Sequence, residues 1–256
     1  MTRWCSVLML CGLVALAGCQ AEVRFAAGID HAPLTALLER YVDEQGLIDY
    51  DRWRQTPADR QALRTYLQAY ARAPAEAAAG ADRQAGLINL YNALVIADVL
   101  QRVEGRESYW SLDPFDDQRH EVGGVVVSLD DIEHGAARPA IGYRVHAALV
   151  CAAISCPPLR RQAYLADDLA TELDRAMAAW LADPRLNRYD PEENLAEVSK
   201  IFDWFAADFE AAGGIPIVLQ RHGPERHREL FDDPALRIAY LPYDKSLNAQ
   251  PETTSK

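Results

Sequence analysis

The spacing of apolar residues along the chain predicts a mainly helical fold. In several stretches apolar positions recur every three or four residues, which is the period of one face of a helix. The stretch at residues 83–103 gives the strongest pattern, because its apolar positions cover a broad face. The predicted helices span residues 34–42, 56–72, 83–103, 164–182 and 199–212.

Patterns typical of strands are fewer and shorter. Residues 120–122 and 125–127 flank Gly123-Gly124, a pair suited to the tight turn of a hairpin. Residues 145–151 and 237–241 are further strand candidates. Together the patterns predict an α+β fold, a helix-rich single domain with a small, mostly antiparallel sheet.

The amino-terminal residues resemble the signal of a bacterial lipoprotein. Arg3 precedes an apolar run that is too short to span a bilayer as a mature helix. The run ends in Leu16-Ala17-Gly18-Cys19, which resembles a lipobox. The resemblance implies cleavage before Cys19, a lipid on its sulfur and acylation of the new amino terminus; an ordinary signal peptide is the alternative. Gln20 stands where an inner-membrane retention signal usually has Asp, which favours the periplasmic face of the outer membrane.

These features divide the chain into four parts. We expect a signal peptide at residues 1–18, a lipid-anchored tether at 19–31, one globular domain at 32–248 and a carboxy-terminal tail at 249–256. Loss of Arg3 with the signal changes the formal net charge from −12 to −13. An acidic surface disfavours nucleic acid as a partner. The expected partners are the membrane, through lipid on Cys19, and an envelope protein.

The residues with the most chemistry, His146, Cys151 and Cys156, lie within one segment, residues 145–159. Cys151 and Cys156 are the only free thiols expected in the mature protein. In an oxidising periplasm a disulfide between them is the simplest interpretation. The alternatives are a thiolate nucleophile with an imidazole base, simple burial of two small apolar thiols, and a zinc site, which lacks the usual paired cysteine spacing.

A regular strand at residues 145–151 would separate His146 from Cys151. Side chains alternate between the two faces of a strand, so an offset of five places them on opposite sides. A direct pair would then require a bulge or an early end of the strand. Cys156 lies beyond the predicted strand and can fold back, which makes it the preferred candidate for chemistry.

Two further pairs of polar residues are candidates. Asn89 and Asn92 share one flank of an apolar helix, where they either tie the helix to a loop or serve a site. Residues 128–131 have the spacing of a capping box, with Asp in place of the usual Glu or Gln. They put Glu133 and His134 in the first turns of a short helix. Neighbouring side chains diverge by about 100° on a helix, so we do not expect both to face one site squarely.

Six short motifs follow one another along the mature chain. They are G-L-I-D-Y from Gly46, I-N-L-Y-N-A-L from Ile88, S-L-D-D-I-E-H-G from Ser128, the segment 145–159, S-K-I-F-D-W-F from Ser199 and L-P-Y-D-K-S-L-N from Leu241. Together they resemble the domain of unknown function numbered 547, over nearly all of the mature chain. The resemblance implies no particular reaction. Lys245 replaces a common aromatic residue and Ala147 a common Phe, and neither change removes a polar candidate.

Two functions of different classes fit these features. In the first, the protein is a lipid-anchored binding or assembly module of the cell envelope. In the second, it is a thiol-dependent hydrolase or acyltransferase that acts on an amide or ester and requires no cofactor. The second function needs a nucleophile, a base and a residue that orients the base. These would be drawn, in that order, from Cys156 or Cys151, from His146 or His134, and from Glu133 or Asn89.

Overall fold

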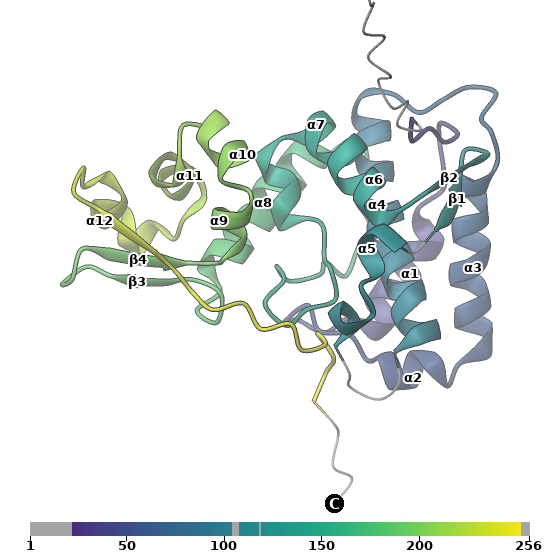
Figure 1. Cartoon of the computed structure of the whole chain (residues 1–256), viewed down its shortest axis with the longest axis horizontal. Coiled ribbons are helices and arrows are strands. Elements are labelled where there is room, and N and C mark those ends of the chain that lie inside the picture. Colours follow the sequence, from purple (N-terminus) through teal and green to yellow (C-terminus); the bar gives the residue numbers. More distant parts are fainter. Residues whose placement is uncertain (1–21, 104–107, 118, 252–256) are drawn as a thin grey trace, which may run out of the picture.

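The computed structural model describes residues 22–103, 108–117 and 119–251. Helices dominate the described part, and two small sheets complete the predicted α+β fold. In Figure 1 the helices α1 to α7 and one hairpin lie on the right, and the second sheet lies on the left with α11 and α12. The predicted signal peptide and Cys19 lie outside the described residues.

The elements have the following bounds. The helices are α1 (Ala32–Tyr41), α2 (Tyr50–Arg54), α3 (Pro57–Ala71), α4 (Gly80–Arg102), α5 (Pro114–Asp117), α6 (Leu129–Ile132), α7 (Arg138–Ile141), α8 (Leu169–Ala182), α9 (Ile201–Trp204), α10 (Ala206–Ala211), α11 (Ile215–His222) and α12 (Arg228–Asp232). Short 3-10 turns form η1 (Tyr109–Leu112), η3 (Tyr143–Ala147) and η4 (Glu225–His227), and η2 (Glu133–Ala137) is one turn of π-helix. The strands are β1 (His120–Val122), β2 (Val125–Val127), β3 (Arg188–Asp190), β4 (Leu195–Val198) and β5 (Arg237–Tyr240).

The predicted helices are present, with two changes of bounds. α8 begins at Leu169 and not at residue 164. The helix predicted at 199–212 is divided into α9 and α10, because the backbone of Phe205 leaves the helical region with φ −112° and ψ 32°. α4 is buried on nearly every side. It is therefore the central helix around which the others pack.

The two sheets are only partly as predicted. β1 and β2 form the predicted antiparallel hairpin, and β5 matches the strand predicted at 237–241. β4 pairs antiparallel with β3 and parallel with β5. β3 and β4 were not predicted, because β3 is short and mostly exposed and carries no apolar alternation.

The strand predicted at residues 145–151 is wrong. Residues 143–147 form η3, and the chain then runs as a loop to the cysteines. The side chain of Asn92 replaces the hydrogen bonds of a neighbouring strand: its Nδ2 donates to Ala148 O and its Oδ1 accepts from Val150 N, each at 2.9 Å. A buried backbone needs hydrogen-bond partners, but they need not come from a neighbouring strand. The Asn92 side chain supplies them, so these residues can stay in a loop.

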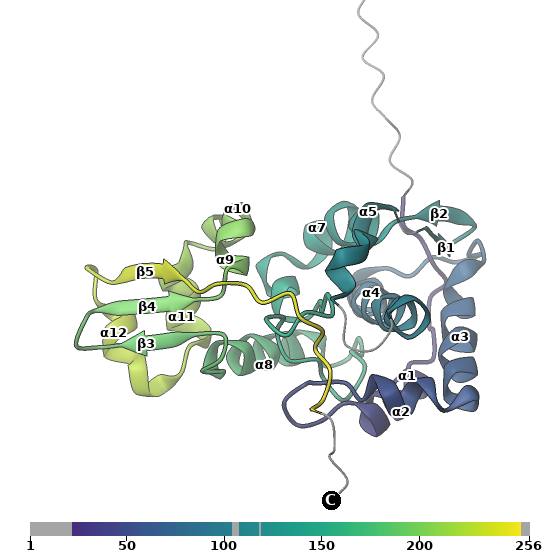
Figure 2. The same ribbon diagram turned by 60° about the horizontal axis from the view of Figure 1, so that its bottom comes forward.

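Apolar side chains form two packed clusters, and most apolar residues of this loop belong to the larger one. The larger cluster surrounds α4, and the smaller surrounds α8, where the rings of Trp180 and Phe202 stack with centroids 4.9 Å apart. After β5 the chain returns to the larger cluster, as the yellow segment in Figure 2 shows. It pairs there with the cysteine loop at Ala153–Leu247 and with Ile48 at Ala249.

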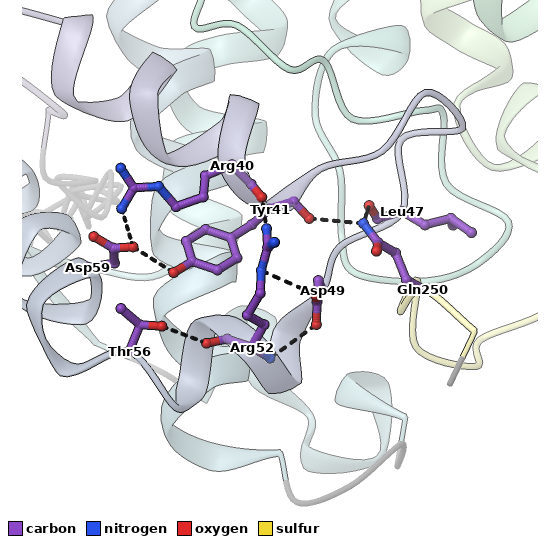
Figure 3. Close-up of polar contacts among 8 residues, drawn as sticks. All are labelled: Arg40, Tyr41, Leu47, Asp49, Arg52, Thr56, Asp59 and Gln250. Carbon is purple, nitrogen blue, oxygen red and sulfur yellow. Dashed lines mark hydrogen bonds and ion pairs between the residues drawn. The ribbon is translucent and has the colours of Figure 1, made fainter. Parts of the chain in front are cut away.

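The two ends of the described chain pack on the domain. Val23 and Phe25, within the predicted tether, are each 2% exposed. Gln250, within the predicted tail, donates from Nε2 to Tyr41 O and Leu47 O at 3.1 and 3.0 Å (Figure 3). Residues of the predicted tether and tail that border the domain thus pack on it. No helix in the described ranges has the length and apolarity needed to cross a membrane.

The corner that receives Gln250 is fixed by Tyr41 at the end of α1. The Tyr41 ring stacks on Trp53 with centroids 4.5 Å apart, and its hydroxyl donates to Asp59 at 2.6 Å. Arg40 donates to the same carboxylate at 2.5 Å (Figure 3). Because Asp59 joins α3 to both residues, the carboxy-terminal segment docks on a rigid corner.

A substitution at Gly46 tests how closely the first helices must approach the segment after the cysteines. It has φ +77°, and a Cβ there would lie 2.5 Å from Leu159 N and 2.6 Å from Pro158 Cα. Gly46→Ala should therefore cost about 3 kcal/mol or more of unfolding free energy in urea titrations. Gly28→Ala is the matched control, since Gly28 has φ +67° with nothing within 4 Å of its added Cβ. Equal losses for the two variants would contradict the close approach.

Candidate functional site

A cavity of about 130 Å³ brings together four of the residues predicted from the sequence, Glu133, His134, His146 and Cys151. Aromatic side chains from six positions form much of the remaining wall: Tyr91, Trp110, Phe115, Trp204, Phe205 and Tyr243. These residues come from both apolar clusters and from the returning carboxy-terminal segment. A wider, shallower groove near α1 and α8 is lined by charged side chains that pair with one another, including Arg161 with Glu44.

Cys151 and Cys156 are free thiols in this structure. Their Sγ atoms lie 2.8 Å apart, which is longer than the roughly 2.05 Å of a disulfide and closer than two unbonded sulfurs ordinarily approach. The disulfide predicted from the sequence is therefore not formed here. Cys151 is half-buried and lines the cavity, whereas Cys156 is 4% exposed. A ligand in the cavity would meet Cys151 first.

The backbone around Ala152 forms a binding site for the Cys156 sulfur. The N–H groups of Cys151 and Ala153 both donate to Cys156 Sγ, at 3.1 and 3.3 Å. Between them, Ala152 has φ +61°, in the left-handed region that residues other than glycine seldom adopt. Backbone N–H groups arranged around such a residue form a concavity that holds an anion. The loop thus places two hydrogen-bond donors where they stabilise negative charge on Cys156.

The two thiols differ in their readiness to ionise. Burial acts to raise the pKa of Cys156, but hydrogen bonds from Cys151, Tyr243 and the backbone outweigh it and leave that pKa below its ordinary value. Burial, followed by the neighbouring Cys156, holds the pKa of Cys151 well above its ordinary value. Tyr243 Oη lies 3.2 Å from Cys151 Sγ and 3.4 Å from Cys156 Sγ. Of the two thiols, Cys156 is therefore the more readily ionised.

His146 is held by a carboxylate and not by a thiol. Its Nε2 lies 2.7 Å from Asp208 Oδ2, and its ring stacks on Phe205 with centroids 4.1 Å apart. Arg138 donates to both oxygens of Asp208, at 2.8 and 3.0 Å. Burial lowers the pKa of His146 to about 4, although the Asp208 hydrogen bond opposes that effect. Within the described residues, no hydrogen bond joins His146 to either sulfur, so the structure contains no direct dyad.

Glu133 and His134 both line the cavity and open the π-helical turn η2. Such turns occur frequently at functional sites. Glu133 is partly buried, whereas His134 is exposed. Burial raises the pKa of Glu133, against the effect of a hydrogen bond from Tyr91. His134 is exposed, and its Nδ1 lies 2.8 Å from Arg138.

The predicted capping box is present and positions this turn. Ser128 Oγ accepts from Asp131 N at 3.0 Å, and Asp131 Oδ2 accepts from Ser128 N at 2.8 Å. The box starts α6, which leads without a break into η2. A local sequence signal thus determines where Glu133 stands.

Asn89 lies apart from the cavity. Its Nδ2 donates to Tyr164 O at 2.8 Å and its Oδ1 accepts from Tyr164 N at 2.9 Å. These bonds tie α4 to the chain beyond the cysteines and leave Asn89 without contact to His146.

Within the described residues, no group of three or more His, Cys, Asp or Glu side chains is arranged to hold a metal ion.

Sequence reasoning missed several residues of the site. Tyr243 stands in the last of the six short sequence motifs, so that motif was the available signal. Tyr91 stands between the two asparagines of another motif. Asp208 and Arg138 lie outside those motifs, and no local pattern marks Asp208 as the partner of His146. Only the fold brings that carboxylate to the imidazole.

The buried imidazole of His146 predicts a pH-dependent stability. Between pH 6.5 and about 4 the unfolded chain binds a proton on His146 that the folded chain does not, so stability should fall as the pH falls through this window. The loss should be on the order of 3 kcal/mol. His146→Gln should flatten the pH dependence measured by urea unfolding. His120→Gln is a positive control, because burial also lowers the pKa of His120 to about 4. Parallel curves for wild type and His146→Gln would contradict the assignment.

The comparisons with known proteins concern the central part of the chain. No curated protein and no solved structure matches the chain. Residues 76–181, which contain both cysteines, His146 and the π-helical turn but not Asp208 or Tyr243, match the family described as "Protein of unknown function, DUF547". This part of the chain is therefore similar to that family.

Proposed function

We propose that the protein is a dithiol redox protein of the cell envelope. In this proposal Cys151 and Cys156 alternate between the dithiol of this structure and a disulfide. They exchange two electrons with a small disulfide or thiol that enters the aromatic-walled cavity. The single observation that carries the proposal is the arrangement of the two sulfurs. A partly exposed thiol, Cys151, lies 2.8 Å from Cys156 Sγ, which accepts hydrogen bonds from two backbone N–H groups.

The proposed reaction proceeds in two exchange steps. Cys151 transfers its proton to Cys156 across their hydrogen bond, and its thiolate attacks one sulfur of the incoming disulfide. The first bond breaks and one thiolate leaves, taking the proton from Cys156. Cys156 then attacks Cys151 Sγ in the mixed disulfide and expels the second thiolate. The protein is oxidised by two electrons, and the ligand is reduced to one thiol and one thiolate.

Tyr243 supports both steps because its hydroxyl lies within hydrogen-bond distance of each sulfur. Hydrogen bonds that stabilise a thiolate increase the ionised fraction of the thiol and make it a better leaving group. One hydroxyl placed between two sulfurs can follow the charge from one to the other. This is the arrangement expected of a site in which both sulfurs are thiolates at different times.

The same geometry gives less support to the thiol-dependent hydrolase or acyltransferase. Acyl transfer requires hydrogen-bond donors directed at the carbonyl oxygen of the substrate. Here the two backbone donors of the loop are directed at Cys156 Sγ. Asp208 could orient His146, but within the described residues no hydrogen bond joins that imidazole to either sulfur. Thiol–disulfide exchange instead needs donors that stabilise a thiolate, and the two backbone N–H groups are already directed at a sulfur.

Trapping of a mixed disulfide tests the proposed chemistry. Hydroxyethyl disulfide should oxidise the protein to a form lighter by two hydrogens in mass spectrometry, and dithiothreitol should restore the dithiol. Cys156→Ser should instead accumulate a mixed disulfide on Cys151, because the second nucleophile is absent. Cys151→Ser is the matched control and should remain unmodified, since Cys156 is almost completely buried. Unreactive thiols, or a disulfide that dithiothreitol does not reduce, would contradict a redox role.

The envelope address is also part of the proposal and rests on the resemblance of residues 16–19 to a lipobox. Labelled palmitate should be incorporated by the wild-type protein in a bacterial host, and the label should fractionate with the outer membrane. Cys19→Ser should abolish the label and release the protein from the membrane. Cys5→Ser is the control and should retain the label, because Cys5 lies in the predicted signal peptide. Label retained by Cys19→Ser would contradict a lipid on Cys19.

A further inference from the structure

We infer that the cavity selects small disulfides that carry an ammonium group, in preference to neutral or anionic ones. This inference rests on the proposed redox function and identifies its substrate class. Three features of the described residues carry it: the charges that line the cavity, the aromatic faces around its mouth and its size.

The lining of the cavity contains carboxyl groups but no Lys or Arg. Asp130 and Glu133 line it beside His134 and the neutral imidazole of His146, and His134 Nε2 lies 3.6 Å from Asp130 Oδ1. No salt bridge within the described residues engages Glu133, although the charges of His134 and Arg138 act on it, and burial raises its pKa. A cationic ligand in the cavity would provide Glu133 with a direct ion pair. An anionic ligand would instead approach two carboxyl groups.

The cations nearest to the cavity are already engaged. Arg138 donates to Asp208 and contacts His134, and its guanidinium lies 4.7 Å from the centroid of Phe205. Lys245 Nζ lies 4.4 Å from the centroid of Trp110. The rings of Phe205 and Trp110 therefore each contact a cationic side chain of this protein. The same attraction favours a ligand that carries positive charge.

Aromatic rings close together at the mouth add to this preference. Trp110, Trp204 and Tyr243 have pairwise centroid distances of 4.6 to 6.0 Å. Trp204 is 43% exposed, so part of its indole surface remains open to a ligand. Ammonium groups bind over such ring faces, and enclosure by several rings is the usual way in which proteins recognise them.

The volume of the cavity limits the ligand to a few heavy atoms. Pockets for drug-sized ligands measure about 300–1,000 Å³, whereas this cavity measures about 130 Å³. A short aminoalkyl thiol fits this space, and a tripeptide thiol does not. The ligand is therefore a small aminothiol disulfide, or the end of a larger molecule that has an amine near its sulfur.

Three disulfides of similar size and different charge provide the test. Cystamine is cationic, hydroxyethyl disulfide is neutral and dithiodiglycolate is anionic. The rate of oxidation of the protein by each would be divided by the rate for 2-mercaptoethanol with the same disulfide, which removes intrinsic reactivity. At 150 mM salt, where remote charges are largely screened, the normalised rate should be about tenfold higher for cystamine than for dithiodiglycolate. Hydroxyethyl disulfide should fall between them.

Variants locate the source of the preference. Glu133→Gln should reduce the cystamine to dithiodiglycolate ratio several-fold, and Asp130→Asn provides an independent second variant. Glu229→Gln removes the same charge from an exposed position in α12 and should leave the ratio unchanged. Equal normalised rates for the three disulfides, or ratios unchanged in both cavity variants, would overturn the inference while the redox function stands. Failure of all three disulfides to oxidise the protein would overturn the redox function itself.

Discussion

The site depends on two side-chain amides of α4 that hold the cysteine loop at the centre of the molecule. Asn92 bonds the loop where it begins, at Ala148 and Val150, and Asn89 bonds the chain where it leaves, at Tyr164. A buried loop has no ladder to satisfy its backbone, so it requires partners of this kind. Because each amide uses both its donor and its acceptor, it fixes the direction of the chain as well as its position. The unusual backbone at Ala152 persists within these fixed ends.

A second constraint joins the two apolar clusters across the cavity. Arg138, at the start of α7, forms a bidentate hydrogen bond with Asp208 of α10. Asp208 is in turn hydrogen-bonded to His146. The planar guanidinium matches a carboxylate in both spacing and direction, which gives such a pair more positional accuracy than a single bond. Phe205 lies against both His146 and Arg138. The aromatic wall formed by α9 and its neighbours is thereby held against the turn that carries Glu133.

Local signals in the sequence were read correctly, and long-range ones were not. The capping box at Ser128 and the hairpin at Gly123 depend on residues within a few positions, so the sequence contains the whole interaction. The alternation rule for residues 145–151 failed because Asn92, 58 residues from Val150, supplies the bonds that a strand would have needed. Glu133 and His134 open a single π-helical turn, which no residue type in the sequence marks. Tyr243 was in a motif, but only the fold shows that its hydroxyl reaches two sulfurs.

The distance of Tyr243 along the chain has a consequence for the order of events during folding. The two cysteines are separated by five residues and meet early, whereas Tyr243 is 87 positions beyond Cys156 and arrives only when the long segment after β5 has docked. Contacts between distant parts of a chain form slowly, because a large loop must first be closed. For a time, therefore, the thiols lie close together without their hydroxyl partner. The thiols acquire their final hydrogen bonds to Tyr243 only when the whole chain, and not the loop alone, has folded.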